Sequence, residues 1–191
     1  MGVIIDGQRL SATLLMNATV LLPIFLIFLI IQTIKQIKAR HIFKLILLIL
    51  LSVYLYLLIS VTLFPVHIFP RGDAVYQNGF GQQAWVTNFD VTQLLTYLPK
   101  QILGNLIMLA PLTFLSAAIN PKFANLLRSL GLGFAVSLTI ELLQLVMSYF
   151  YLGNRICDIN DLLLNTLGAM LGYCAFAVCQ KILIKAKVIE Q

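Results

Sequence analysis

The sequence predicts an all-α fold, a polytopic bundle of five helices that each cross a membrane, and three observations support it. Of the 191 residues, 60% are hydrophobic and only 10% are charged, with a mean hydropathy of +0.95. A soluble domain has about 45–50% apolar and about 25% charged residues. The apolar residues form long runs, and most basic residues lie between those runs. The chain is therefore an integral membrane protein, and its net charge of +6 does not indicate a nucleic-acid partner.

Each of the five apolar runs is long enough to cross a bilayer, which takes about 20 predominantly apolar residues in a helix. Hydrophobic residues cover all sides of these helices, as expected for segments that face lipid. Pro111 lies within the third run, where it removes a backbone donor and leaves a carbonyl that needs a local partner. The predicted spans are residues 10–34, 45–64, 102–119, 129–152 and 162–180.

The basic residues predict how the helices are oriented. Nine of the thirteen Lys and Arg residues fall after the first run, after the third run or in the C-terminal tail. Basic segments near membrane spans stay on the cytoplasmic side. The sequence therefore predicts an N-terminus outside, a C-terminus in the cytoplasm, and two loops facing outward, at residues 65–101 and 153–161.

The loop of residues 65–101 is the longest connection in the chain. Its first half is rich in Gly, Asn and Gln and is predicted to be irregular. Apolar residues at helical spacing in its second half indicate a short helix on the membrane surface, anchored by Trp85 and Tyr97. The alternative is a loop that only connects two spans. The apolar positions are Val91, Leu94, Leu95 and Leu98.

Glu141 is the single charged residue of the fourth run, and it lies in the middle of that run. An ionisable group in hydrocarbon costs about 2.5–3.5 kcal/mol on insertion scales, so its presence indicates a functional role. Four polar residues spaced 4, 3 and 4 apart lie on the same helix face as one another, which must point at other helices or at a wet cleft. They are Ser137, Glu141, Gln144 and Ser148.

The fifth run has a matching face, polar at its outer end and small further in. The residues on it are spaced 3, 4, 3 and 4 apart, and the last two form a GxxxG pattern that lets two backbones approach closely. The fourth and fifth runs are joined by a short loop, so they pack antiparallel and their polar faces are expected to meet. The residues are Asp158, Asp161, Asn165, Gly168 and Gly172.

These faces predict a polar cleft that opens to the outer leaflet, with Arg155 at its mouth and Glu141 at its base. Arg155 would pair with Asp158 or bind a lipid phosphate. Helix arithmetic at 1.5 Å per residue puts Asp158 and Asp161 at the rim, about 20 Å from Glu141. A buried network that only fixes helix packing is the alternative. The candidate ligand-binding residues are Asn105, Glu141, Gln144, Arg155, Asp158, Asp161 and Asn165, with Pro111, Gly168 and Gly172 in structural roles.

The sequence predicts no catalytic residue, no metal site and no cofactor. It has no Gly-rich phosphate loop, no HExxH, no GxSxG and no CxxC, and its Cys and His residues lack metal-ligand spacing. A binding protein is therefore favoured over an enzyme, with membrane lipids and a lipid-linked cell-wall precursor or a lipoglycopeptide as partners. The alternatives are an enzyme that acts on lipid head groups with its carboxylates as acid and base, or a lipid transporter or flippase.

Three blocks of the sequence resemble the VanZ-like family of bacterial membrane proteins: TNFDV at residues 87–91, GNLIMLAPLTFL at 104–115, and SLTIELLQ followed by NRICDINDLLLNTLGAMLGY at 137–173. The family's S…E..Q and R..D..D...N..G pattern falls on the candidate cleft residues. The resemblance implies a four-helix domain at residues 45–191, with residues 1–44 as an extra span and a basic cytoplasmic loop. It also implies a multi-pass protein of the bacterial cytoplasmic membrane that is linked to tolerance of glycopeptide antibiotics, teicoplanin in particular.

Overall fold

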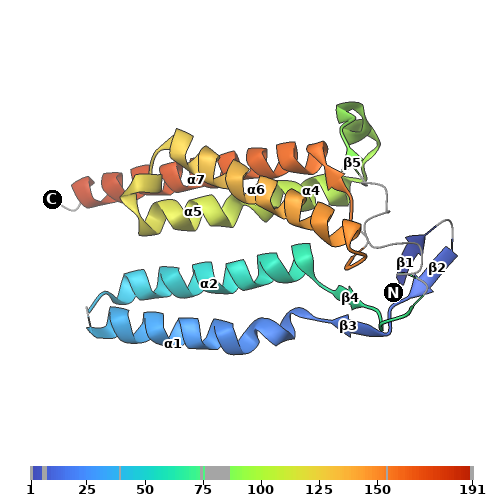
Figure 1. Cartoon of the computed structure of the whole chain (residues 1–191). Helices are drawn as coiled ribbons and strands as arrows, with labels where there is room; N and C mark the ends of the chain where they lie inside the picture. Colours follow the sequence, from blue (N-terminus) through green and yellow to red (C-terminus); the bar gives the residue numbers. More distant parts are fainter. Residues whose placement is uncertain are drawn as a thin grey trace.

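The computed structural model describes residues 2–5, 8–38, 40–73, 75, 87–153 and 155–189. The five predicted helices are confirmed as candidate membrane spans, since five helices in this part of the chain are long and apolar enough to cross a membrane. They lie side by side in a mostly helical bundle, and the short strands gather at one end of it (Figure 1). We call this the strand end. The opposite end, which we call the basic end, carries the loops of Arg40 and Lys122.

The helices differ from the predicted spans mainly at their ends. The first span is η1 (Ala18–Leu21) with α1 (Leu22–Lys38), and the second is α2 (Ile42–Leu63). The third is broken into α4 (Pro99–Met108) and α5 (Ala110–Ile119). The short η3 (Pro121–Phe123) leads into α6 (Leu126–Tyr149), and the fifth span is α7 (Ile159–Ile189).

The first span begins later than predicted because the chain before it is extended. Residues counted toward that span lie in β2 (Gln8–Ser11), which pairs with β1 (Gly2–Ile5), and in β3 (Leu14–Met16), which pairs with β4 (Val66–Ile68). In the outer loop, β5 (Thr87–Asn88) pairs in parallel with β6 (Cys157–Asp158). The predicted surface helix is the short 3-10 helix η2 (Val91–Thr96).

The break in the third span lies at Leu109, two residues before Pro111. Leu109 has φ −100° and ψ 0°, outside the helical range. The Tyr54 hydroxyl of α2 donates a hydrogen bond of 2.7 Å to the carbonyl of Met108 beside this break. A side chain of another span thus supplies a partner for backbone at the proline break, which lipid could not provide.

Close packing around α7 holds four of the helices together. α7 packs against α4, α5 and α6, while α1 packs chiefly on α2 (Figure 1). A Cβ at Gly168 would overlap the carbonyl of Leu106, and one at Gly172 would overlap the carbonyl of Ala110. The two glycines therefore bring α7 against α4 and α5, not against α6.

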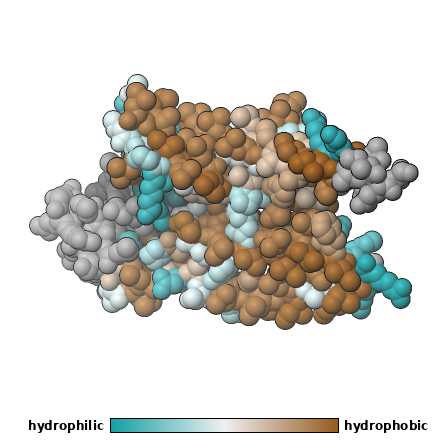
Figure 2. Space-filling view, turned by 180° about the vertical axis from the view of Figure 1, so that it is seen from behind, coloured by the Kyte–Doolittle hydropathy of each residue, from teal (hydrophilic) through white to brown (hydrophobic). Residues whose placement is uncertain are grey.

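The flank of the bundle is suited to lipid. Figure 2 shows hydrophobic residues over most of the visible flank, with hydrophilic residues concentrated toward its ends. Large apolar side chains remain exposed there, including Ile24 on α1, Leu57 on α2 and Ile107 on α4. An exposed surface of this kind is stable in hydrocarbon, whereas a soluble protein rarely tolerates such large apolar patches.

Candidate functional site

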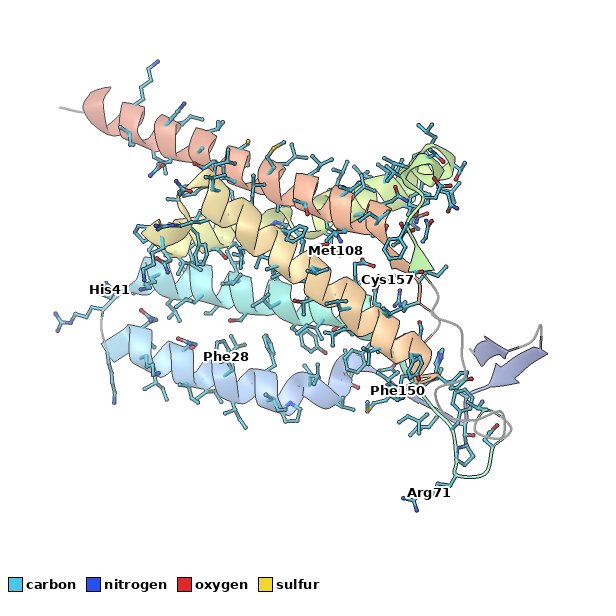
Figure 3. All side chains as sticks on the ribbon, turned by 45° about the horizontal axis from the view of Figure 1, so that its top comes forward. Phe28, His41, Arg71, Met108, Phe150 and Cys157 are labelled. Atoms are coloured by element: carbon cyan, nitrogen blue, oxygen red, sulfur yellow. The ribbon has the colours of Figure 1, made fainter. Side chains whose placement is uncertain are left out.

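The connection between α6 and α7 folds back along the bundle. In Figure 3 it leaves the end of α6 at Phe150 and returns to Cys157 beside the start of α7. The hydroxyl of Ser148 on α6 exchanges hydrogen bonds with the backbone of Arg155, accepting from its amide at 3.0 Å. The amide of Asp158 then donates to Glu141 Oε2 at 2.9 Å. The rim aspartate expected about 20 Å from Glu141 at 1.5 Å per residue is therefore in contact with it.

That distance was wrong because helix arithmetic assumes a connection that lies at the bilayer surface. Here residues 155–158, which we call the return segment, lie beside the last turns of α6. The helix α7 therefore begins near the depth of Glu141. Tyr151 makes the reversal possible by adopting φ 58°, a left-handed conformation that is uncommon outside glycine. Its side chain is buried with Phe69 and Val75, which holds the turn in place.

The fold-back brings three carboxyl groups within electrostatic range of one another. The charges of Asp158 and Asp161 both act on Glu141, whose side chain is 3% exposed. The side-chain amide of Asn105, on α4, donates a hydrogen bond to Asp161 Oδ1. Residues of α4, α6 and α7 thus contribute to this acidic cluster. The polar faces of the fourth and fifth spans predicted the contributions of α6 and α7 only. In the described residues, no group of three His, Cys, Asp or Glu side chains has the geometry to hold a metal ion.

Asp158 also holds the outer loop against α7. Its Oδ2 accepts hydrogen bonds from the Tyr97 hydroxyl and from Asn88 Nδ2, the latter at 3.0 Å. Its Oδ1 accepts from the amide of Asn160 at 2.8 Å, as an N-capping side chain does at the start of a helix. Burial, followed by the bond to the Asp158 carboxylate, raises the pKa of Tyr97 to about 12.

The expected membrane anchors at residues 85 and 97 have different outcomes. Tyr97 is half-buried and its hydroxyl donates to Asp158, a partner that the predicted interfacial anchor did not include. Periodicity placed it beside an apolar stripe but carried no signal of a partner 61 residues later. Trp85 lies outside the described residues.

Gln144 and Arg155 connect the site to the C-terminal end of α2. Gln144 Nε2 donates to the carbonyl of Thr62 at 2.9 Å. The Arg155 guanidinium donates to the carbonyls of Val61 and Phe64 at 3.2 and 3.3 Å. A cation is favourable there, since the carbonyls at a helix C-terminus carry partial negative charge. The Nη2 of Arg155 thus binds α2 and not Asp158, its expected partner.

Asn165 and Asn160 complete the buried polar group. Asn165 Nδ2 donates to the hydroxyl of Ser137 at 3.1 Å, which joins the inner parts of the two polar faces. Asn160, which the sequence analysis missed, is fully buried and donates to the carbonyl of Asp90 at 2.9 Å. The only sequence signal for it was its position two residues after a capping aspartate. Within the described residues, the Oδ1 atoms of both asparagines lack a hydrogen-bond partner.

The candidate residues therefore form a mostly buried network instead of the walls of a wide cleft. Of the seven, only Arg155 and Asp161 are half-buried, and the other five are each at most 8% exposed. Open space lies beside the network, in an apolar groove between α2 and α4 with a volume of about 620 Å³. Asn105 belongs to both, because it lines this groove and donates to Asp161.

A comparison with protein families fits this arrangement. A family model described as VanZ/LLP1 matches residues 19–180. The chain belongs to the VanZ/LLP1 family. The match takes in α1 as well as the later spans, and it includes every residue of the polar network of this VanZ/LLP1 protein. No curated protein and no solved structure matches the chain. Family and helices together indicate a multi-pass membrane protein of the VanZ/LLP1 family.

Proposed function

We propose that this VanZ/LLP1 protein binds an amphiphile of the outer leaflet, either a lipid-linked cell-wall precursor or a lipoglycopeptide, and so raises tolerance of glycopeptide antibiotics such as teicoplanin. The strand end faces the outside in this proposal. The basic end carries Arg40, Lys44, Lys122 and Arg128, and basic loops stay cytoplasmic. The bound molecule would place its polar group near the carboxyl cluster and its chain in the groove.

The double role of Asn105 is the observation that carries the proposal. Its side chain lines the apolar groove and also donates to Asp161, whose charge acts on Glu141. A polar group that enters the groove can therefore compete for the Asn105 amide and alter the acidic cluster. A network that served only to hold helices together would not need carboxyl groups, because Asn, Gln and Ser provide interhelical hydrogen bonds at lower cost.

The test is antibiotic susceptibility in a teicoplanin-sensitive bacterium that expresses the full chain. We expect the wild-type protein to raise the inhibitory concentration of teicoplanin several-fold. Asn105→Ala and Glu141→Gln are each expected to remove most of that increase at matched membrane expression. Gly131→Ala serves as the control, because a Cβ at this exposed position on α6 meets no atom within 4 Å.

A second comparison tests whether protection depends on the acyl chain of the antibiotic. The same cells are exposed to the teicoplanin core without its acyl chain, for which the protein is expected to give little protection. The proposal would be rejected if Asn105→Ala and Glu141→Gln both protected as well as the wild type. Loss of protection in Gly131→Ala would show instead that the assay reports general damage to the bundle.

An enzyme acting on lipid head groups is the second candidate, and the fold-back favours it more than the sequence did. Glu141 and the two aspartates are close together, so a carboxylic acid and a carboxylate could act on one substrate. Purified protein in vesicles would be incubated with a lipid-linked precursor, with Mg²⁺ or with EDTA, and products followed by mass spectrometry. Absence of turnover under both conditions would rule this candidate out.

A further inference from the structure

A continuous apolar groove runs along the third span. Two adjoining cavities of about 620 and 790 Å³ lie between α2 and the broken helix α4–α5. They share five lining residues, so they form one groove with Tyr54 where the two parts meet. The second part continues to α7, where Gly172 contributes to the lining. The shared residues are Tyr54, Leu57, Leu103, Ile107 and Pro111.

The groove has a polar end and an apolar end. Lys100, Gln101 and Asn105 line it at the strand end, whereas the lining of the second part consists of apolar residues and Tyr54. Lys100 precedes Leu103 and Gly104 by three and four residues, so its side chain projects from the same face of α4 as theirs. Among the described residues that line the groove there is one cation and no acid.

The length of the groove suits a hydrocarbon chain. From Lys100 to Leu115 the third span rises roughly 20 Å at 1.5 Å per residue. One leaflet of a bilayer has a hydrocarbon depth of about 15 Å, half of the usual 30 Å. A chain that starts at the strand end can therefore lie along the whole groove, with its head group at the level of Lys100.

We propose that this groove holds the hydrocarbon chain of an outer-leaflet amphiphile whose head group carries a negative charge beside Lys100. A lysine at the mouth acts as a point charge for a phosphate or carboxylate, which Lys binds well. The inference deepens the proposed function, on which it relies for the outward direction of the strand end. It adds that the chain extends along both parts of the groove, and that the head group carries a negative charge.

Gly104 provides a way to fill the groove without disturbing the bundle. It is exposed on α4 and lines the groove, and a Cβ built there meets no atom within 4 Å. Larger side chains at this position therefore extend into the groove, and all of them favour a helix more than glycine does. Gly131 on α6 is the matched control, since it is also exposed with nothing within 4 Å of its Cβ, and it does not line the groove.

The experiment uses the purified full chain in phosphatidylcholine vesicles that contain a little phosphatidylglycerol with a photoactivatable diazirine in its acyl chain. After irradiation, labelled peptides are identified by mass spectrometry. We expect labelling at groove residues such as Tyr54 and Ile107. Labelling should fall stepwise, and finally several-fold, along the series Gly104→Ala, Gly104→Leu and Gly104→Trp. Gly131→Trp should label like the wild type, and thermal melting should be similar for all these proteins.

A parallel arm tests the charge with phosphatidylcholine that carries the same diazirine chain. The wild type should label less with this neutral-headed probe than with phosphatidylglycerol. Lys100→Gln should remove the difference, and Lys122→Gln, at the basic end, should keep it. Equal labelling by the two probes in the wild type would overturn the anionic head group.

If Gly104→Trp melts like the wild type and its groove residues are labelled to the same extent, the groove does not hold the lipid chain. The susceptibility assay separates the two proposals. If Gly104→Trp loses lipid labelling but still protects cells from teicoplanin, the groove binds lipid and the proposed function fails. If labelling persists in Gly104→Trp while Glu141→Gln loses protection, the proposed function stands and the groove inference fails.

Discussion

The backbone amide of Asp158 donates a 2.9 Å hydrogen bond to Glu141 Oε2, across 17 residues of sequence. This contact places the first turn of α7 beside α6 about two turns before α6 ends. A costly carboxyl group inside a membrane span thus has a backbone donor as its partner, so the return segment and the acid depend on each other.

Glu141 is expected to tolerate replacement by glutamine better than by alanine. Glutamine keeps an oxygen that can accept from the Asp158 amide, whereas alanine leaves this buried N–H unpaired, at a cost of about 1–3 kcal/mol. Thermal melting in detergent should therefore rank wild type, Glu141→Gln and Glu141→Ala in order of decreasing midpoint. Equal midpoints for the two variants would contradict a structural role for the bond.

Gly172→Ala is expected to destabilise the bundle by about 1–3 kcal/mol, the usual cost of overpacking a well-packed core. The new methyl group would overlap the carbonyl of Ala110, and the Thr113 hydroxyl lies close by, so α7 would have to move away from α5. Gly131→Ala, with open space around its Cβ, should be neutral or slightly stabilising in the same melting experiment. A neutral Gly172→Ala would mean that the two helices are not in contact at this point.

Arg155→Ala is expected to loosen the return segment between α6 and α7. It removes the hydrogen bonds to the carbonyls of Val61 and Phe64, and a bond to a charged group contributes about 1.5–3 kcal/mol. Cys157, in this segment, is half-buried, and burial raises the pKa of its thiol, followed by the charges of Glu141 and Asp158. Maleimide labelling of Cys157 should therefore be several-fold faster in Arg155→Ala.

Both proteins in that comparison carry serine at Cys174 and Cys179, so that only one thiol reacts. Arg155→Lys serves as an intermediate case, because lysine keeps the charge but not the planar donor arrangement. If the alanine variant labels at the wild-type rate, the guanidinium does not hold the segment.

His67 is expected to make stability depend on pH. Burial, and then nearby positive charge that includes Arg155, lowers the pKa of His67, which is 5% exposed. An unfolded histidine has a pKa of about 6.5, so the unfolded chain takes up this proton more readily than the folded one. By linkage, His67 reduces stability progressively as the pH falls below about 6.5 and has little effect above it.

The measurement compares melting at mildly acidic and mildly alkaline pH. His67→Gln should lose less stability on acidification than the wild type does. The other histidine, His41, is exposed, so His41→Gln should behave like the wild type. The opposite ranking of the two variants would show that His67 protonates freely in the folded protein.

The strand end is expected to face the outside of the cell. Leu95, at this end, is 90% exposed, and Lys122 is exposed at the basic end. In a chain whose three cysteines are replaced by serine, Leu95→Cys should react with a membrane-impermeant maleimide on intact cells. Lys122→Cys should react only after permeabilisation, because basic loops stay inside. The reverse pattern would invert the topology and move the groove mouth to the cytoplasm.

Much of the architecture can be predicted from the sequence. The hydrocarbon thickness fixes how many apolar residues a span needs, so five runs gave five helices, with errors mainly at their ends. Helical spacing also matched the inner polar residues of the fourth and fifth spans correctly, as the bond from Asn165 to Ser137 shows. Periodicity is informative here because a regular helix repeats with a known angle.

The tertiary structure alone decided how these faces are connected. The chain reverses at Tyr151, and the amide of Asp158 contacts Glu141. The Tyr97 hydroxyl bonds to Asp158, and the Arg155 guanidinium binds backbone carbonyls of α2. The tertiary structure also opened the groove beside Asn105, whose walls come from residues far apart in the chain. None of these features produces a periodic pattern in the sequence. An irregular segment follows the path that satisfies its backbone hydrogen-bonding groups, and in a membrane the partners of those groups come from other helices.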